Sequence, residues 1–174
     1  TSIAPNYDSV KGRYWSADPE WLSQTESTSK GGRSLLLSFI QEIDICIDQT
    51  LSKLEEGYHI DAFLWHQGES DQGKGKDYYD NLKAVVTYVR THLSQKTGKD
   101  YSKLPFIFGT VARSNKSYSC EVEAGMRHLA EEDSNAYLID MSDAELLNDR
   151  LHFNKKSAEH LGKEMYKRLA EIMF

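Results

Sequence analysis

The sequence has few of the features that mark disulfide scaffolds, membrane proteins or nucleic-acid-binding proteins. Its 174 residues include two cysteines, too few for a disulfide framework. No apolar run approaches the roughly 18 residues of a membrane span, so we expect no membrane partner. The net charge is −6, and basic residues gather only in pairs such as Lys155-Lys156. A nucleic-acid partner is therefore not expected, because it needs a basic face. The length suits a single domain over residues 1–174.

The chain begins at Thr1, with no initiator methionine and no signal peptide. We expect such a start to result from processing, engineering or truncation, and it leaves the compartment open. The two cysteines have different settings. Cys46 falls on the inward stripe of a predicted helix and is expected to be a small core residue, whereas Cys120 opens another helix and is expected to be partly exposed.

Apolar spacing predicts alternating helices and strands after an irregular stretch at 1–33, where Tyr14, Trp15 and Trp21 are expected to be packing anchors. Helices are predicted for 34–56, 78–93, 119–132 and a final segment capped by Asn154, and strands for 60–65, 104–111 and 136–140. This alternation indicates an α/β layered domain around a parallel sheet. Three strands are few for such a sheet, so we expect at least one more strand upstream of this chain.

A polar block, Trp65-His66-Gln67-Gly68-Glu69-Ser70-Asp71, directly follows the first predicted strand. Active sites in open α/β sheets collect just past the carboxyl ends of the strands. The Gln67 amide is suited to donate to a developing oxyanion, a contact that can lower a barrier by about 3 kcal/mol. The plain alternative is that Gly68 and Asp71 are turn residues and that Glu69 is solvated.

A second polar block, Asn148-Asp149-Arg150-Leu151-His152-Phe153, precedes the last predicted helix. An Asp three residues before a His can accept the imidazole Nδ1–H, which fixes the tautomer and leaves Nε2 as a general base. Taken alone, an Asp-x-x-His pair is more often a pair of loop polar residues, because so short a motif occurs frequently by chance.

Together the two blocks resemble the carbohydrate esterase group of the SGNH hydrolases, which includes acetylxylan esterases and sialate O-acetylesterases. The resemblance covers roughly residues 33–174. It implies a three-layer, flavodoxin-like sandwich and a serine esterase that removes acetyl groups from carbohydrates without a metal or organic cofactor. Asp149 and His152 would be the acid and base of the triad. Gln67 would contribute to the oxyanion hole, and Glu69 would help to order the catalytic histidine.

The sequence departs from the family pattern at the nucleophile. In the family a serine lies in an N-terminal Gly-Gln-Ser-Asn-type block, and no serine here follows Gly-Gln or Gly-Asp. We therefore expect the serine, and a missing N-terminal segment of the same domain, to lie upstream of Thr1, and this chain alone to be inactive. Gly31-Gly32, near a family oxyanion loop, receive no role. His66 is either a packing residue or part of the site, and Asp71 is expected to cap the following turn or helix.

Other interpretations stay open. Ser70 follows a strand and precedes a helix as a nucleophile does, but the Gly-x-Ser-x-Gly pattern fails at Gln72. Thr1 as an N-terminal nucleophile is less favoured. Metal sites built on His66 or His128 lack a second suitably spaced histidine. A noncatalytic carbohydrate-binding domain on an esterase scaffold is the alternative from another class, because fold does not fix function.

Overall fold

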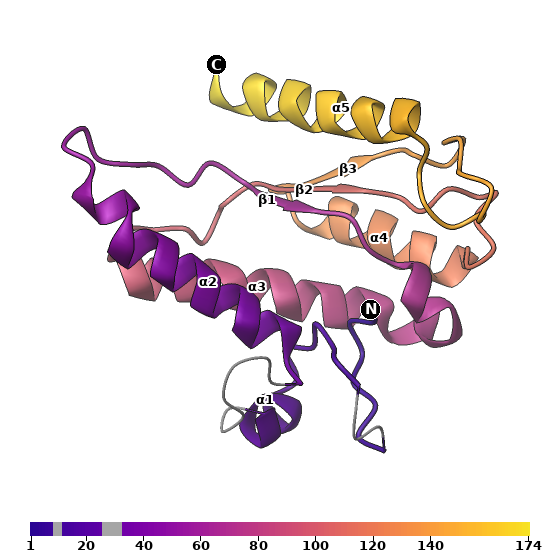
Figure 1. Ribbon diagram of the computed structural model, residues 1–174, viewed down its shortest axis with the longest axis horizontal. Helices are drawn as coiled ribbons and strands as arrows, with labels where there is room; N and C mark the ends of the chain where they lie inside the picture. The colour runs from indigo at the N-terminus through magenta and orange to yellow at the C-terminus, as the bar shows by residue number, and fades with distance from the viewer. Residues whose placement is uncertain (9–11, 26–32) are drawn as a thin grey trace. The chain divides into compact units, whose positions relative to one another are not determined.

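The computed structural model describes residues 1–8, 12–25 and 33–174, drawn in colour in Figure 1. Gly31-Gly32 lie outside the described residues. The chain forms two compact units. The first comprises Thr1–Ser2, Asp61–Asp80 and Leu104–Phe174, and the second comprises Ile3–Ile60 and Asn81–Lys103. No helix in the described part of the chain is long and apolar enough to cross a membrane.

The first unit contains a parallel sheet with the strand order β1-β2-β3. Its strands are β1 (Phe63–Trp65), β2 (Phe106–Gly109) and β3 (Ala136–Ile139). In register, Phe63 lies opposite Phe106, and Phe106 lies opposite Ala136. The three predicted strands and their parallel arrangement are confirmed, although β1 and β2 are shorter than the apolar runs that predicted them.

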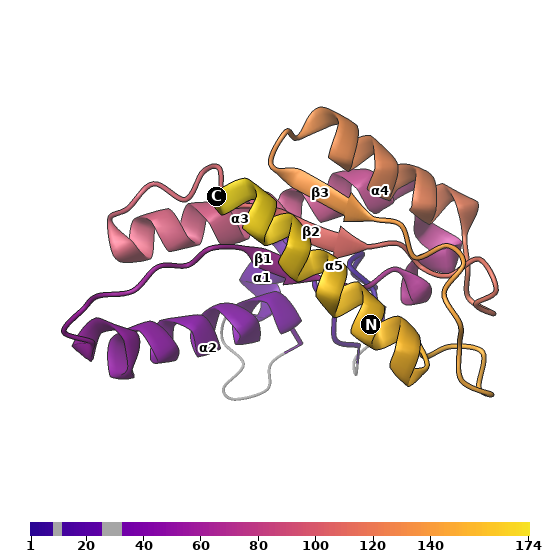
Figure 2. The same ribbon diagram turned by 90° about the horizontal axis from the view of Figure 1, so that it is seen from above.

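Helices cover both faces of this sheet. α4 (Cys120–Glu132) and α5 (Lys155–Met173) lie on opposite sides of it in Figure 1. α5 packs on β2 and β3 and lies in front of the sheet in Figure 2, while α4 packs on β3 and on η2 (Glu69–Asp77). This arrangement confirms the predicted three-layer α/β fold. The predicted cap is also present, because Asn154 accepts a hydrogen bond from the Ser157 amide at 2.9 Å.

The alternation of side chains along β2 gives each helix layer its own core. Ile107 packs with residues of β3 and α5 in a cluster of Ile107, Ile139, Met141, Leu161 and Met165. On the opposite face Phe106 and Phe108 stack at 4.7 Å, and Phe63 lies 5.2 Å from Phe106. Because β2 is buried at every position, its sequence is continuously apolar rather than alternating.

The second unit contains α1 (Pro19–Thr25), α2 (Leu35–Gln49), η1 (Leu51–Lys53) and most of α3 (Tyr78–Thr97). Two pairs join α2 to α3: the His92 imidazole lies 2.8 Å from Asp44, and the Lys96 ammonium lies 2.7 Å from Asp48. The helix predicted for 34–56 ends earlier than expected, at Gln49, and is followed by the short 3₁₀ turn η1.

The stretch 1–33, predicted as irregular, contains the helix α1. The sequence marks the start of this helix with an N-cap residue followed by proline, a signal separate from the apolar spacing. Asp18 accepts from the Trp21 amide at 2.8 Å, and Pro19 takes the first helical position. Trp21 is fully buried and lies edge-on to Tyr14 at 5.2 Å. It is therefore the packing anchor predicted for this stretch.

The place of Cys46 on the apolar stripe of α2 predicted a core residue, and this prediction is wrong. Cys46 is exposed, and so is Cys120. The buried residues of α2 are Leu36, Ile40 and Ile47. The buried stripe is narrower than the apolar stripe of the sequence, so Cys46, one position before Ile47, points away from it.

Candidate active site

The chain turns sharply at Gly68, where β1 gives way to the polar block. Gly68 has φ 156°, a conformation that residues with a side chain rarely adopt. A Cβ atom there would lie 2.9 Å from Val111 Cγ2 and 2.9 Å from Met126 Cε. The block is therefore held against the start of the β2–α4 loop and against α4, at the carboxyl end of the sheet.

Gln67 is the centre of a buried hydrogen-bond network. Its Nε2 donates to the Asp71 carboxylate at 2.6 Å and to the Thr1 carbonyl at 2.7 Å. The Tyr78 hydroxyl donates to the Gln67 carbonyl at 2.9 Å and lies 3.3 Å from Gln67 Oε1. Ser2 donates from its hydroxyl to Asp71. Both amide hydrogens of Gln67 thus have protein acceptors in this arrangement.

Asp71, which we expect to cap the following turn or helix, is buried, and its carboxylate accepts hydrogen bonds from Gln67 and Ser2. Burial, and then the negative charge of Asp71, raises the pKa of Tyr78 well above its ordinary value. The Tyr78 hydroxyl therefore remains protonated and serves as a donor to Gln67.

Glu69 faces His66, with Oε1 3.4 Å from the imidazole Nε2. Burial has the largest single effect and raises the pKa of Glu69. Hydrogen bonds from His66 and from the backbone amide of Glu69 lower it, as do the charges of His66 and the N-terminus. The net result is a pKa below the ordinary value. The His66 ring also lies against Phe153, the residue after His152. The structure thus brings the two polar blocks together through His66 and Phe153.

Asp149 and His152 form the hydrogen bond that their spacing predicts. Asp149 Oδ2 lies 2.6 Å from His152 Nδ1. The other carboxylate oxygen, Oδ1, accepts from the backbone amides of Leu151 at 2.9 Å and His152 at 3.0 Å. An antiparallel bridge between Leu146 and Phe153 closes the loop behind them. The Asp149 carboxylate therefore both shapes the turn and orients the imidazole.

These contacts keep the Asp149 carboxyl ionised. The hydrogen bond from the His152 side chain, followed by those from the backbone amides of His152 and Leu151, holds the pKa of Asp149 well below its ordinary value. The carboxylate is thus ionised at neutral pH and holds its acceptor oxygen toward Nδ1. The His152 side chain is 70% exposed, so Nε2 is accessible to a reacting group.

No histidine that the structure describes forms a hydrogen bond with Ser70. Its hydroxyl oxygen accepts a hydrogen bond from the Thr1 ammonium group at 2.9 Å, and it is exposed. Among the described residues, no serine hydroxyl forms a hydrogen bond with His152, whose recorded side-chain partner is Asp149. The histidines proposed as metal ligands have other contacts: His66 packs on Phe153, and the His128 ring lies 4.2 Å from that of Tyr79. Within the described ranges no group of three or more potential ligands is placed to hold a metal ion.

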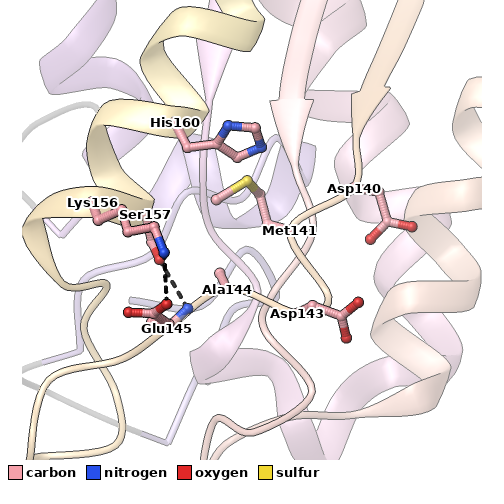
Figure 3. A pocket seen from close by; sticks show the side chains of 8 residues that line it. All are labelled: Asp140, Met141, Asp143, Ala144, Glu145, Lys156, Ser157 and His160. Carbon is pink, nitrogen blue, oxygen red and sulfur yellow. Dashed lines mark hydrogen bonds and ion pairs between the residues drawn. The ribbon is translucent and has the colours of Figure 1, made fainter.

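A hollow of about 310 Å³ lies beside this site, between the segment after β3 and the first turns of α5 (Figure 3). None of the predicted catalytic residues lines it. Several of its polar groups are already paired, since Glu145 contacts Lys156 Nζ at 2.9 Å and the Glu145 amide donates to Ser157 at 2.8 Å. Asp140 is likewise paired with Arg127 at 3.1 Å.

A third polar segment, which the sequence analysis passed over, follows β2. Asn115 is buried, and its side-chain amide donates to the Leu151 carbonyl at 2.8 Å. Lys116 contacts the same loop, with Nζ 3.1 Å from the Asp149 carbonyl. The signal that locates these residues is their place just past the carboxyl end of a strand, the rule that singled out the other two blocks.

The fold and the Asp–His pair at the carboxyl edge of the sheet are features of the serine hydrolase class. A family model described as carbohydrate esterase, sialic acid-specific acetylesterase, matches residues 27–171. The chain therefore belongs to this family of carbohydrate esterases. The family implies the SGNH fold, which agrees with three parallel strands between helices.

Among solved structures, the chain resembles a protein from Arabidopsis thaliana with a TM-score of 0.61 and 24% sequence identity. The match covers 75% of this chain and 51% of the plant protein, so the chain spans about half the length of that protein. A likeness at this identity shows the fold alone. Comparison with curated proteins gives no match.

Proposed function

We propose that this chain carries the acid–base half of a serine esterase that removes acetyl groups from carbohydrates. The single observation that supports the proposal is the 2.6 Å hydrogen bond between Asp149 Oδ2 and His152 Nδ1, in a member of the carbohydrate esterase family. A carboxylate on Nδ1 keeps the proton there and leaves Nε2 as the base.

The nucleophilic serine of this proposal lies in sequence upstream of Thr1. The basis is twofold: the resemblance implies an N-terminal serine block, and no described serine hydroxyl is hydrogen-bonded to His152. The segment that carries this serine is thus a required partner of the chain, together with an acetylated carbohydrate substrate.

The reaction then proceeds in two steps. His152 Nε2 takes the proton from the serine hydroxyl as the serine oxygen attacks the acetyl carbonyl, and the same proton passes to the departing sugar oxygen. Water, deprotonated by Nε2, then attacks the acetyl-serine and releases acetate and the free serine. Asp149 stabilises the imidazolium in both steps without itself becoming protonated.

Gln67 is proposed to donate to the tetrahedral oxyanion. Its amide hydrogens are bound to Asp71 and to the Thr1 carbonyl, so this role requires that the oxyanion replace the Thr1 carbonyl as the acceptor. Glu69 is proposed to order the site through His66, whose ring packs beside the catalytic loop on Phe153.

The test compares the natural protein with the 174-residue chain. Intact mass and N-terminal sequencing define the natural product, and p-nitrophenyl acetate hydrolysis is measured for both, with His152→Ala in each. The proposal predicts a longer natural protein with a Gly-x-Ser block, active and dependent on His152, and an inactive 174-residue chain. Activity of the chain alone points to Ser70 as the nucleophile, and inactivity of both forms favours a carbohydrate-binding domain.

A further inference from the structure

Two adjacent residues of the β2–α4 loop hold three consecutive carbonyl groups of the loop that carries the Asp149–His152 pair. The Asn115 side-chain amide donates to the Leu151 carbonyl at 2.8 Å. The Lys116 backbone amide donates to the Arg150 carbonyl at 3.0 Å, and Lys116 Nζ donates to the Asp149 carbonyl at 3.1 Å. Each carbonyl between the acid and the base is therefore tied to one short segment.

The amide groups of the catalytic loop have partners within the loop itself. The Arg150 amide donates to the Leu147 carbonyl at 2.9 Å, and the amides of Leu151 and His152 donate to Asp149 Oδ1. Arg150 has φ 55°, the left-handed conformation that is unfavourable for a residue other than glycine. Bonds from outside the loop are needed to maintain such a turn, because its own contacts are local and exposed.

Asn115 is itself fixed in place. It is 5% exposed, its backbone amide donates to the Ala112 carbonyl at 3.0 Å, and its side-chain Oδ1 accepts from the Ser117 backbone amide at 2.8 Å. Its carbonyl accepts from the Tyr118 amide at 3.0 Å. Asn115 is thus a rigid point in the β2–α4 loop, from which its side-chain amide extends to the loop that carries Asp149 and His152.

We propose that Asn115 is a positioning residue for the Asp149–His152 pair, with Lys116 as its weaker companion. The inference deepens the proposed function and rests on it for its catalytic meaning. Asn115 acts through the loop backbone. By holding the Leu151 carbonyl it orients the planar peptide unit whose amide, that of His152, donates to Asp149 Oδ1, and this leaves Oδ2 for the imidazole. Positioning of this kind affects catalysis strongly, because small displacements of a base are costly to the rate.

The test is Asn115→Asp in the 174-residue chain, with Asn135→Asp as the matched control. Asn115→Asp retains the acceptor for Ser117 but sets an oxygen against the Leu151 carbonyl. Asn135 precedes β3 at the other end of the sheet, where its side chain contacts Ser134. We expect the Leu151 and His152 amides to exchange with solvent about tenfold faster in Asn115→Asp. We also expect the ¹⁵N spectrum of the neutral His152 ring to change from the Nδ1–H form to a mixture of tautomers, with neither change in Asn135→Asp.

A second variant keeps the test decisive if Asn115→Asp does not fold. Lys116 is exposed, and Lys116→Met removes only the bond from Nζ to the Asp149 carbonyl. It should raise the same exchange rates about two- to threefold. Unchanged exchange and an unchanged tautomer in whichever variant folds overturn the proposal. These measurements need no ester hydrolysis. If the longer natural protein proves inactive while the loop of this chain responds as expected, the proposed function is refuted and the positioning role remains.

Discussion

The ring of His66 lies against the ring of Phe153, with centroids 4.7 Å apart and planes tilted by 33°. This contact joins the polar block after β1 to the loop before α5, two segments more than 80 positions apart in the sequence. His66 contacts Glu69 on one side and Phe153 on the other, and Phe153 directly follows His152 in the chain. The two motifs that indicated an esterase are thus parts of one site.

The His66–Phe153 contact gives a test of whether His66 is a packing or a chemical residue. His66→Phe retains an aromatic ring against Phe153, whereas His66→Ala does not. If packing is the role, His66→Phe keeps the unfolding temperature and the esterase activity of the serine-carrying protein, and His66→Ala lowers both. In His66→Phe the pKa of Glu69 should also rise, because a hydrogen bond from His66 helps to hold it down. A ¹³C titration of the Glu69 carboxyl measures that shift. Loss of activity without loss of stability in His66→Phe would assign His66 a chemical role.

Replacing Asp149 by Asn should reduce kcat of the serine-carrying protein by about 10⁴-fold, because an amide at Oδ2 favours the wrong imidazole tautomer. The fold should remain, since the side chains of both residues are exposed. In the unsubstituted chain, the pKa of the Asp149 carboxyl should lie well below its ordinary value, because His152 and two backbone amides donate to it. A ¹³C titration of that carboxyl is the measurement. Ordinary titration would mean that the pair is not hydrogen-bonded in solution.

Gln67 provides a test that separates a structural from a catalytic role. Gln67→Met removes the amide from the network of Asp71 and Tyr78 and should lower the free energy of unfolding by about 1–3 kcal/mol, because buried partners lose their hydrogen bonds. Tyr78→Phe disturbs the same network from the other side without removing the amide. If Gln67 also donates to the oxyanion, Gln67→Met should reduce kcat by about 10²- to 10³-fold, while Tyr78→Phe should not. Equal kcat values in the two variants would leave Gln67 with a structural role alone.

Gly68 and Gly73 form a matched pair for the turn after β1. Gly68→Ala places a Cβ atom 2.9 Å from Val111 and Met126 side-chain atoms at φ 156°, and it should lower the free energy of unfolding by about 1–3 kcal/mol. A Cβ atom at Gly73 meets nothing within 4 Å, so Gly73→Ala should have little effect. Urea unfolding of both variants checks this. A tolerant Gly68 would show that the polar block is free to move away from α4.

Glu123 gives a pH dependence of stability with a defined sign. Hydrogen bonds from Arg113, opposed by burial and reinforced by Arg127 and Tyr118, lower the pKa of Glu123 from 4.5 to about 2. A group with a depressed pKa stabilises the fold above its unfolded value, and its contribution is lost as the pH falls toward the folded value. The stability difference between the unsubstituted chain and Glu123→Gln should therefore shrink between pH 4.5 and 2. Glu131→Gln, at an exposed position of the same helix, is the control for the loss of a carboxylate from α4.

The sequence by itself determined the order of the strands and main helices after residue 33 and the pairing of Asp149 with His152. Helical and strand periodicities report local burial, and a spacing of three residues on a short loop allows the two side chains to come within hydrogen-bond reach. The N-cap of α5 at Asn154 is equally local. These features need only neighbours in the chain.

Only the tertiary structure decided which groups surround that pair. The sequence predicts Gln67 to be available as a donor, but its amide hydrogens are bound to Thr1 and Asp71, and Tyr78 donates to its backbone carbonyl. Asn115 carries no motif, and its bond to the Leu151 carbonyl exists because the β2–α4 loop lies beside the loop that carries Asp149 and His152. Likewise the exposure of Cys46 depends on how wide a stripe of α2 is covered. Such contacts join residues distant in the chain, and their geometry is fixed by the packing of strands and helices.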